Sequence, residues 1–171
     1  LDLNTIPHLG LDQPWWNQNA NESLSINDVL YYTFSDLSIM DNNACAGVLF
    51  NKQMLVDYGL EDPYQLVRDG KWTYDKVHEM SKAVVKDMNG DGAMKNADDQ
   101  FGFLGQVDVM LAFYNGSGER FASKDDNGLP LIAFGSDRGM AVIDSIMNLM
   151  YDNDTTVNAH KSNDSVNNNI T

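Results

Sequence analysis

The sequence predicts an α/β fold, a mixed sheet flanked by helices, and two patterns support this prediction. The run Ala46–Phe50 is apolar at every position, which is typical of a strand buried on both faces of a sheet. The segment 74–86 carries apolar residues at helical spacing, which predicts one buried stripe: Val77, Met80, Val84 and Val85. Strands that alternate with helices along a chain favour an α/β lobe.

The first 45 residues contain one further predicted strand. Residues 1–28 are polar and rich in turn formers, without sustained periodicity. Val29–Phe34 combines β-branched and aromatic residues, a composition that predicts a strand. Residues 35–43 are expected to form a loop that leads into Ala46–Phe50.

Capping residues define three helices after this strand. Asn51 is placed to cap a helix over 52–58, and Gly59 can end it in left-handed geometry. Asp62-Pro63 pairs an N-cap with a proline at the first helical position, where the missing N–H costs nothing. Thr73 is the expected cap of the third, longer helix.

The second half of the chain alternates between short strands and helices. The predicted elements are a strand over Phe101–Leu104, a helix over Val107–Tyr114, a hairpin joining Arg120–Ala122 to Leu131–Phe134, and a last helix capped by Ser136. The inner face of that helix is expected to hold Ile143, Ile146, Met147 and Met150. The stretch 152–171 has little apolar content and predicts a disordered tail.

Composition excludes several classes of function. Of the 171 residues, 11 are Lys or Arg and 25 are Asp or Glu, which gives a net charge of −14. Such a surface repels phosphate backbones and anionic lipid, so nucleic acid is not an expected partner. Cys45 is the only cysteine, so no intrachain disulfide forms, and its apolar surroundings favour packing over reactivity. No apolar run approaches the roughly 20 residues that a membrane span needs.

The order of elements in 46–86 resembles extracellular solute-binding proteins of family 1, the substrate-binding component of sugar ABC transporters. A strand ending in Phe50-Asn51-Lys52 leads to a short helix that Gly59 ends, and Gly70-Lys71-Trp72-Thr73 then opens an amphipathic helix. The resemblance implies a partial periplasmic-binding-protein-like (type II) lobe. Residues 1–36 would end the first lobe, and 37–151 would form an incomplete second, C-terminal lobe.

The resemblance also implies the function and the partners. The chain is expected to be part of an extracellular, cell-surface protein that is lipid-anchored in its full length and is not an enzyme. It would bind an oligosaccharide by hinge closure of two lobes and deliver it to ABC permease subunits. An exposed lobe face and an open sheet edge also allow a homodimer of this chain.

Candidate ligand contacts follow from aromatic residues and from the loops that face the cleft in this family. Sugars stack their C–H faces on flat aromatic rings, which makes Trp15 and Trp16 candidate platforms. The resemblance adds Asp36, Tyr114 and Asn115 near the ligand. Packing of one or both tryptophans between the lobes, and a turn role for Asp36, are the alternative interpretations.

An acidic loop is the sharpest local motif. Asp87, Asn89 and Asp91, followed by Gly92, match the start of an EF-hand-like loop, with the carbonyl of Ala93 as a backbone ligand and Asp98 at position 12. Hard oxygen ligands at alternate positions favour Ca²⁺ in a structural role. The alternative is a solvated turn without metal.

Two other functions compete with sugar binding. A calcium-dependent cell-surface interaction module, dockerin- or EF-like, would rest on the acidic loop, but such a module needs a duplicated loop. A carbohydrate-active enzyme is the other alternative. His8, His78 and His160 share no neighbourhood in the predicted elements, and no nucleophile or phosphate-binding motif is present.

Overall fold

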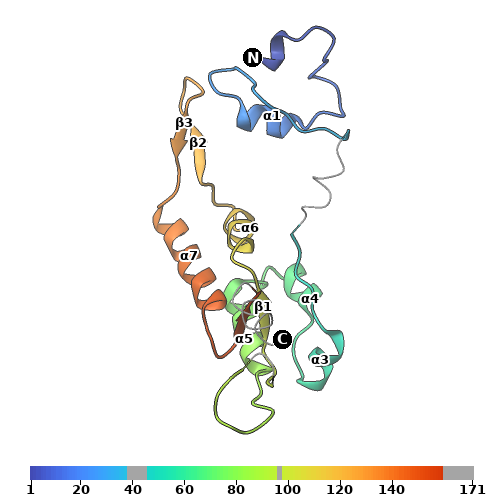
Figure 1. Cartoon of the computed structure of the whole chain (residues 1–171), viewed down its shortest axis with the longest axis vertical. Helices are drawn as coiled ribbons and strands as arrows, with labels where there is room; N and C mark the ends of the chain where they lie inside the picture. The colour runs from blue at the N-terminus through green and yellow to red at the C-terminus, as the bar shows by residue number, and fades with distance from the viewer. Residues whose placement is uncertain (38–45, 96–97, 160–171) are drawn as a thin grey trace, which may run out of the picture. The chain divides into compact units, whose positions relative to one another are not determined.

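The computed structural model describes residues 1–37, 46–95 and 98–159, and the chain divides into two compact units (Figure 1). The first unit comprises Leu1–Gly47 and Arg120–Phe134. The second comprises Val48–Glu119 and Gly135–Thr171. The chain therefore passes between the units three times, after Gly47, Glu119 and Phe134. The predicted division into lobes at 36/37 stays a prediction.

The first unit combines short helices with a hairpin. Its elements are the 3₁₀ turn η1 (Leu3–Thr5), α1 (Gln18–Leu24), β2 (Ala122–Lys124) and β3 (Pro130–Ile132). The side chain of Asn17 caps α1 by accepting a hydrogen bond from the backbone N–H of Ala20 at 2.9 Å. The antiparallel pairing of β2 with β3 confirms the predicted hairpin, with its strands shifted toward the turn.

The hairpin is fastened to the N-terminal segment by polar contacts. The backbone N–H of Asn27 donates to the carbonyl of Gly128 in the turn, at 3.0 Å. The ammonium of Lys124 donates to the carbonyl of Glu22 and, at 2.8 Å, to the hydroxyl of Ser25. Segments about 100 residues apart in the sequence are thus held in one unit.

Four of the five helices described in the second unit begin at the predicted caps. The five helices are α3 (Lys52–Asp57), α4 (Pro63–Arg68), α5 (Tyr74–Ala83), α6 (Val109–Gly116) and α7 (Asp137–Met150). Helix α6 begins two residues after the predicted start at Val107, without a side-chain cap. The side chains of Asn51, Asp62, Thr73 and Ser136 each accept a hydrogen bond from the first turn of the helix that follows. Gly59 lies at φ +62°, the left-handed geometry expected of a residue that ends a helix.

A parallel pair of strands and three helices form the core of the second unit. β1 (Phe103–Gly105) pairs in parallel with β4 (Thr156–Asn158), and α5 and α6 both pack against α7 (Figure 1). The buried cluster consists of Tyr114, Ile146 and Met150, surrounded by Tyr74, Phe103, Val109, Met110, Phe113, Val142 and Ile143. This mixture of helices and small sheets confirms an α/β composition.

Two predicted strands are absent from the described structure. Neither Val29–Phe34 nor Ala46–Phe50 forms a strand in the described structure, although Val29 takes part in an isolated bridge with Ile26. A strand needs a partner with a matching register, and apolar or β-branched composition does not supply one. Neither segment joins a sheet of the described structure.

The prediction of a disordered tail after residue 151 is wrong for Thr156–Asn158, which forms β4. The hydroxyl of Thr156 donates to the carbonyl of Leu149 at 2.6 Å, and its residue is buried beside α7. The low apolar content of this stretch predicts disorder, but polar contacts hold its strand in place. On α7, Leu149 is buried and Met147 is exposed, a correction to the predicted inner face. Residues 160–171 lie outside the described residues.

Candidate functional site

Two of the predicted ligand-binding residues meet in the first unit. Trp16 and Ser35 form an antiparallel bridge, and the backbone N–H of Asp36 donates to the carbonyl of Trp15 at 2.9 Å. A second bond, from the N–H of Asn17 to the carbonyl of Phe34 at 2.9 Å, closes the other side of the bridge. The backbone therefore places residues Trp15 and Asp36 opposite each other on two neighbouring segments.

The two adjacent tryptophans have different environments. Trp15 is 46% exposed, whereas Trp16 is half-buried and its indole N–H donates to the carbonyl of Leu9 at 3.2 Å. A buried indole usually finds such a partner, and its ring then fixes the loop. Trp15 is consequently the ring that can stack on a ligand, and Trp16 is the ring that holds the loop in place.

Sequence reasoning missed two aromatic residues beside this bridge. Tyr32 and Phe34 are about half exposed, and their ring centroids lie 6.3 Å apart with nearly perpendicular planes. Thr33 and Ser35, between and beyond them, are half-buried. Alternate residues of an extended segment project to the same side. That alternation was the available signal in the sequence, whereas the prediction of a strand over Val29–Phe34 rests on composition.

The other two predicted contacts lie in the second unit. Tyr114 is 2% exposed in the core cluster, so its ring is not available to a ligand in this arrangement. Asn115 follows it on α6 and is exposed. The helical stripe that buries Tyr114 also contains Met110, on the preceding turn, and both contact the core.

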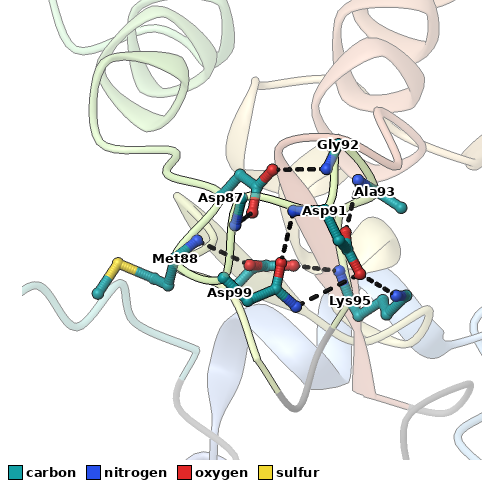
Figure 2. A network of polar contacts seen from close by, with 9 residues as sticks. Asp87, Met88, Asp91, Gly92, Ala93, Lys95 and Asp99 are labelled. Carbon is teal, nitrogen blue, oxygen red and sulfur yellow. Dashed lines mark hydrogen bonds and ion pairs between the residues drawn. The ribbon is translucent and has the colours of Figure 1, made fainter.

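The acidic loop is built from hydrogen bonds between side chains and its own backbone (Figure 2). The carboxylate of Asp87 accepts from the N–H groups of Gly90 at 2.6 Å and Gly92 at 2.8 Å. The side chain of Asn89 accepts from the N–H of Asp91 at 2.9 Å. The loop is therefore a series of turns in which side-chain oxygens satisfy backbone donors.

The carboxylate that closes this loop is Asp99. Its two oxygens accept from the N–H of Met88 at 2.8 Å and from the N–H of Lys95 at 2.7 Å (Figure 2). The side chain of Asp98, predicted for this role, makes no hydrogen bond to another described residue.

Lys95 provides the positive charge of the loop. Its ammonium donates to Asp91, a hydrogen bond that is the main cause of the lowered pKa of the Asp91 carboxyl. The same contact raises the pKa of Lys95. Because this pair is at the surface, water and salt screen it.

The acidic loop has the donor chemistry of a calcium site but a different arrangement. Carboxylate and amide oxygens suit Ca²⁺. In the described structure these oxygens face backbone N–H groups and one ammonium. No group of three or more His, Cys, Asp or Glu side chains among the described residues is arranged to hold a metal ion. Calcium binding by Asp87, Asn89, Asp91, Ala93 and Asp98 stays a prediction.

A second polar cluster, not expected from the sequence, joins α5 to the turn after α7. His78 Nε2 lies 2.8 Å from Asp152 Oδ2, and Lys82 Nζ lies 3.4 Å from the same oxygen. Partial burial raises the pKa of Asp152, but the hydrogen bonds from His78, Thr155, Lys82 and the N–H of Asp154 outweigh it and hold the pKa below its usual value. The cluster borders an open depression of about 590 Å³.

Comparisons of the chain with models of protein families, with curated proteins and with solved structures found no match. Within residues 1–37, 46–95 and 98–159, no helix is both long enough and apolar enough to cross a membrane.

Proposed function

We propose that this chain belongs to an extracellular solute-binding protein that captures an oligosaccharide for an ABC permease. The proposal includes the finer fold assignment, a partial type II lobe, the cell-surface location and the absence of catalysis. It rests on the order of motifs in 46–86 together with one structural observation: Trp15 exposes its ring, and its backbone carbonyl accepts a hydrogen bond from the N–H of Asp36.

The chemistry of this pair suits a sugar. An exposed indole face stacks on the C–H face of a pyranose, and a neighbouring carboxylate accepts hydrogen bonds from its hydroxyls. The bridge between Trp16 and Ser35 holds the backbone of both groups, so little conformational entropy is lost on binding. Tyr32 and Phe34 extend the aromatic surface available near it.

Hinge closure is the mechanism that this proposal implies. A ligand shifts an equilibrium between open and closed forms only by its differential affinity for the closed form. The ligand therefore needs contacts from two lobes, and Trp15 and Asp36 would be the contribution of the first lobe, residues 1–36.

The test is to titrate oligosaccharides into the full chain. Binding is measured by calorimetry and by the change in intrinsic tryptophan fluorescence. We expect saturable binding of at least one member of a panel of neutral oligosaccharides. Trp15→Ala should weaken it about tenfold, because a stacking contact contributes about 0.5–1.5 kcal/mol beyond its buried area. Asp36→Asn should weaken binding without changing the secondary structure.

Tyr31→Ala is the matched control. Tyr31 is an exposed aromatic residue of the same unit, with exposure similar to that of Trp15. It should leave the affinity within about twofold of the original, a change below 0.5 kcal/mol. The proposal fails if no oligosaccharide binds at its solubility limit, or if the Trp15 and Tyr31 variants lose affinity equally.

A further inference from the structure

An apolar groove runs through the second unit. It has a volume of about 560 Å³, and its walls come from Val48–Phe50, α3, α5, β1 and β4. The side chains within it include Met54, Leu60, Trp72, Met80, Phe101 and Val157. Few polar groups reach it: Asn51, Ser81 and Asp99. A groove of this composition exposes apolar surface to water, which is unfavourable.

Val48–Phe50 forms one wall and is itself unpaired. No backbone hydrogen bond joins these three residues to another described residue. The side chain of Leu49 is 97% exposed, although it lies in the most apolar run of the sequence. The backbone N–H and C=O groups of this segment thus have no described hydrogen-bond partner, and its leucine side chain is not packed.

β1 also lines the groove and has an open edge. Within the described residues, β1 pairs with β4 alone, so its other edge is unpaired. Leu104 in the middle of β1 is 68% exposed. An unpaired strand edge presents a row of backbone donors and acceptors to any extended segment that reaches it.

We propose that Val48–Phe50 is a strap that closes this groove by pairing in parallel with the open edge of β1. The resulting sheet has the order strap, β1, β4. The strap has three residues, the same number as β1 and as β4. The helices α3, α4 and α5 lie between the strap and β1 in the sequence, and a strand–helix–strand connection of this kind joins parallel strands.

The strap is a better occupant of the open edge than the alternatives. It already lines the groove and is covalently tethered to it, so closure requires no second molecule. It is apolar on both faces, as a central strand must be. A second copy of the chain would have to approach against a net charge of −14 on each molecule.

Amide hydrogen exchange on the full, unmodified chain tests the strap directly. Closure predicts slow exchange at 48–50 and at the open edge of β1, at a level independent of protein concentration. Rapid exchange at 48–50 in the folded chain overturns the proposal. Protection that grows with concentration also overturns it, because a second copy then provides the pairing strand.

A pair of variants provides the second measurement. Leu49→Asp introduces a charge into the strap, and Val56→Asp introduces the same charge at an exposed aliphatic residue of α3. We expect Leu49→Asp to lower Tm by about 5 °C or more, since it removes a contact of the closed sheet, and Val56→Asp to change it by about 1 °C. Equal changes in Tm for the two variants overturn the proposal. Stoichiometric binding of a fatty acid in the groove, with amide exchange at 48–50 unchanged, also overturns it.

Discussion

The hydroxyl oxygen of Tyr114 on α6 lies 2.7 Å from the point that a Cβ atom at Gly139 on α7 would occupy. Ser136 Oγ and Glu119 Oε2 lie 3.0 Å and 3.2 Å from the same point. The absence of a side chain at Gly139 therefore lets α6 and α7 approach closely over the buried ring. This contact explains why a residue predicted to face a ligand is instead part of the core.

Gly139→Ala should consequently destabilise the second unit by about 1–3 kcal/mol, the usual cost of overpacking, although alanine favours helices over glycine. Gly116→Ala is the matched control, because its nearest foreign atom is 3.9 Å away. It should be neutral or stabilising. Urea unfolding provides both values, and addition of Tyr114→Phe to Gly139→Ala should recover part of the loss. Equal stability of the two glycine variants would contradict this packing.

The acidic loop makes a prediction that distinguishes adjacent carboxylates. Asp99→Ala should destabilise the chain by about 1–2 kcal/mol, because two backbone N–H groups lose their acceptor. Asp98→Ala should change the free energy of unfolding by less than about 0.5 kcal/mol. Chemical denaturation of the two variants is the measurement. A larger loss of stability for Asp98→Ala than for Asp99→Ala would instead support the arrangement predicted from the sequence, in which Asp98 closes the loop.

Calcium dependence is a separate prediction about the same loop. If the loop binds Ca²⁺ structurally, EDTA lowers Tm reversibly and Ca²⁺ restores it. Lys95→Met should enlarge this change in Tm, because the ammonium of Lys95 forms an ion pair with Asp91 and would compete with Ca²⁺ for its carboxylate. Lys71→Met, an exposed lysine outside the loop, serves as the control. If neither EDTA nor Ca²⁺ changes the Tm of the unmodified chain or of Lys95→Met, the loop does not hold a structural calcium ion.

The pair formed by His78 and Asp152 predicts a pH dependence. The folded-state pKa of Asp152 is lowered, so its contribution to stability is present above the unfolded-state pKa of about 4 and is lost as pH falls through the folded-state value. Asp152→Asn should reduce stability at neutral pH and should flatten the decrease below about pH 4. Asp144→Asn, at an exposed residue of α7, should leave the profile unchanged. An identical acid profile for both variants would exclude this role of Asp152.

Local chemistry made much of the second unit predictable. The caps at Asn51, Asp62, Thr73 and Ser136 set helix starts because the acceptor and its donors are within three residues of each other. The hairpin was equally predictable, since its turn joins neighbouring segments. The attachment of the hairpin to the N-terminal segment was not predictable, because the contact between Asn27 and Gly128 joins residues that are far apart in the sequence.

The candidate site was predicted only in part. Trp15 and Asp36 were identified as residues, but their backbone contact depends on a bridge that no spacing in the sequence indicates. Tyr114 is a predicted ligand contact, and only its place in the core cluster shows that its ring is buried. The chemical type of a side chain suggested which residues could contact a ligand. The exposure of each side chain decided which of them are accessible to one.

The sequence by itself determined the starts of the four capped helices and the hairpin, because each depends on interactions between residues close together along the chain. Only the tertiary structure decided that Thr156–Asn158 pairs with β1, that Asp99 closes the acidic loop, and that Trp15 is exposed while Tyr114 is buried. Those outcomes depend on contacts between distant segments and on burial, and neither is encoded in the spacing of any short motif.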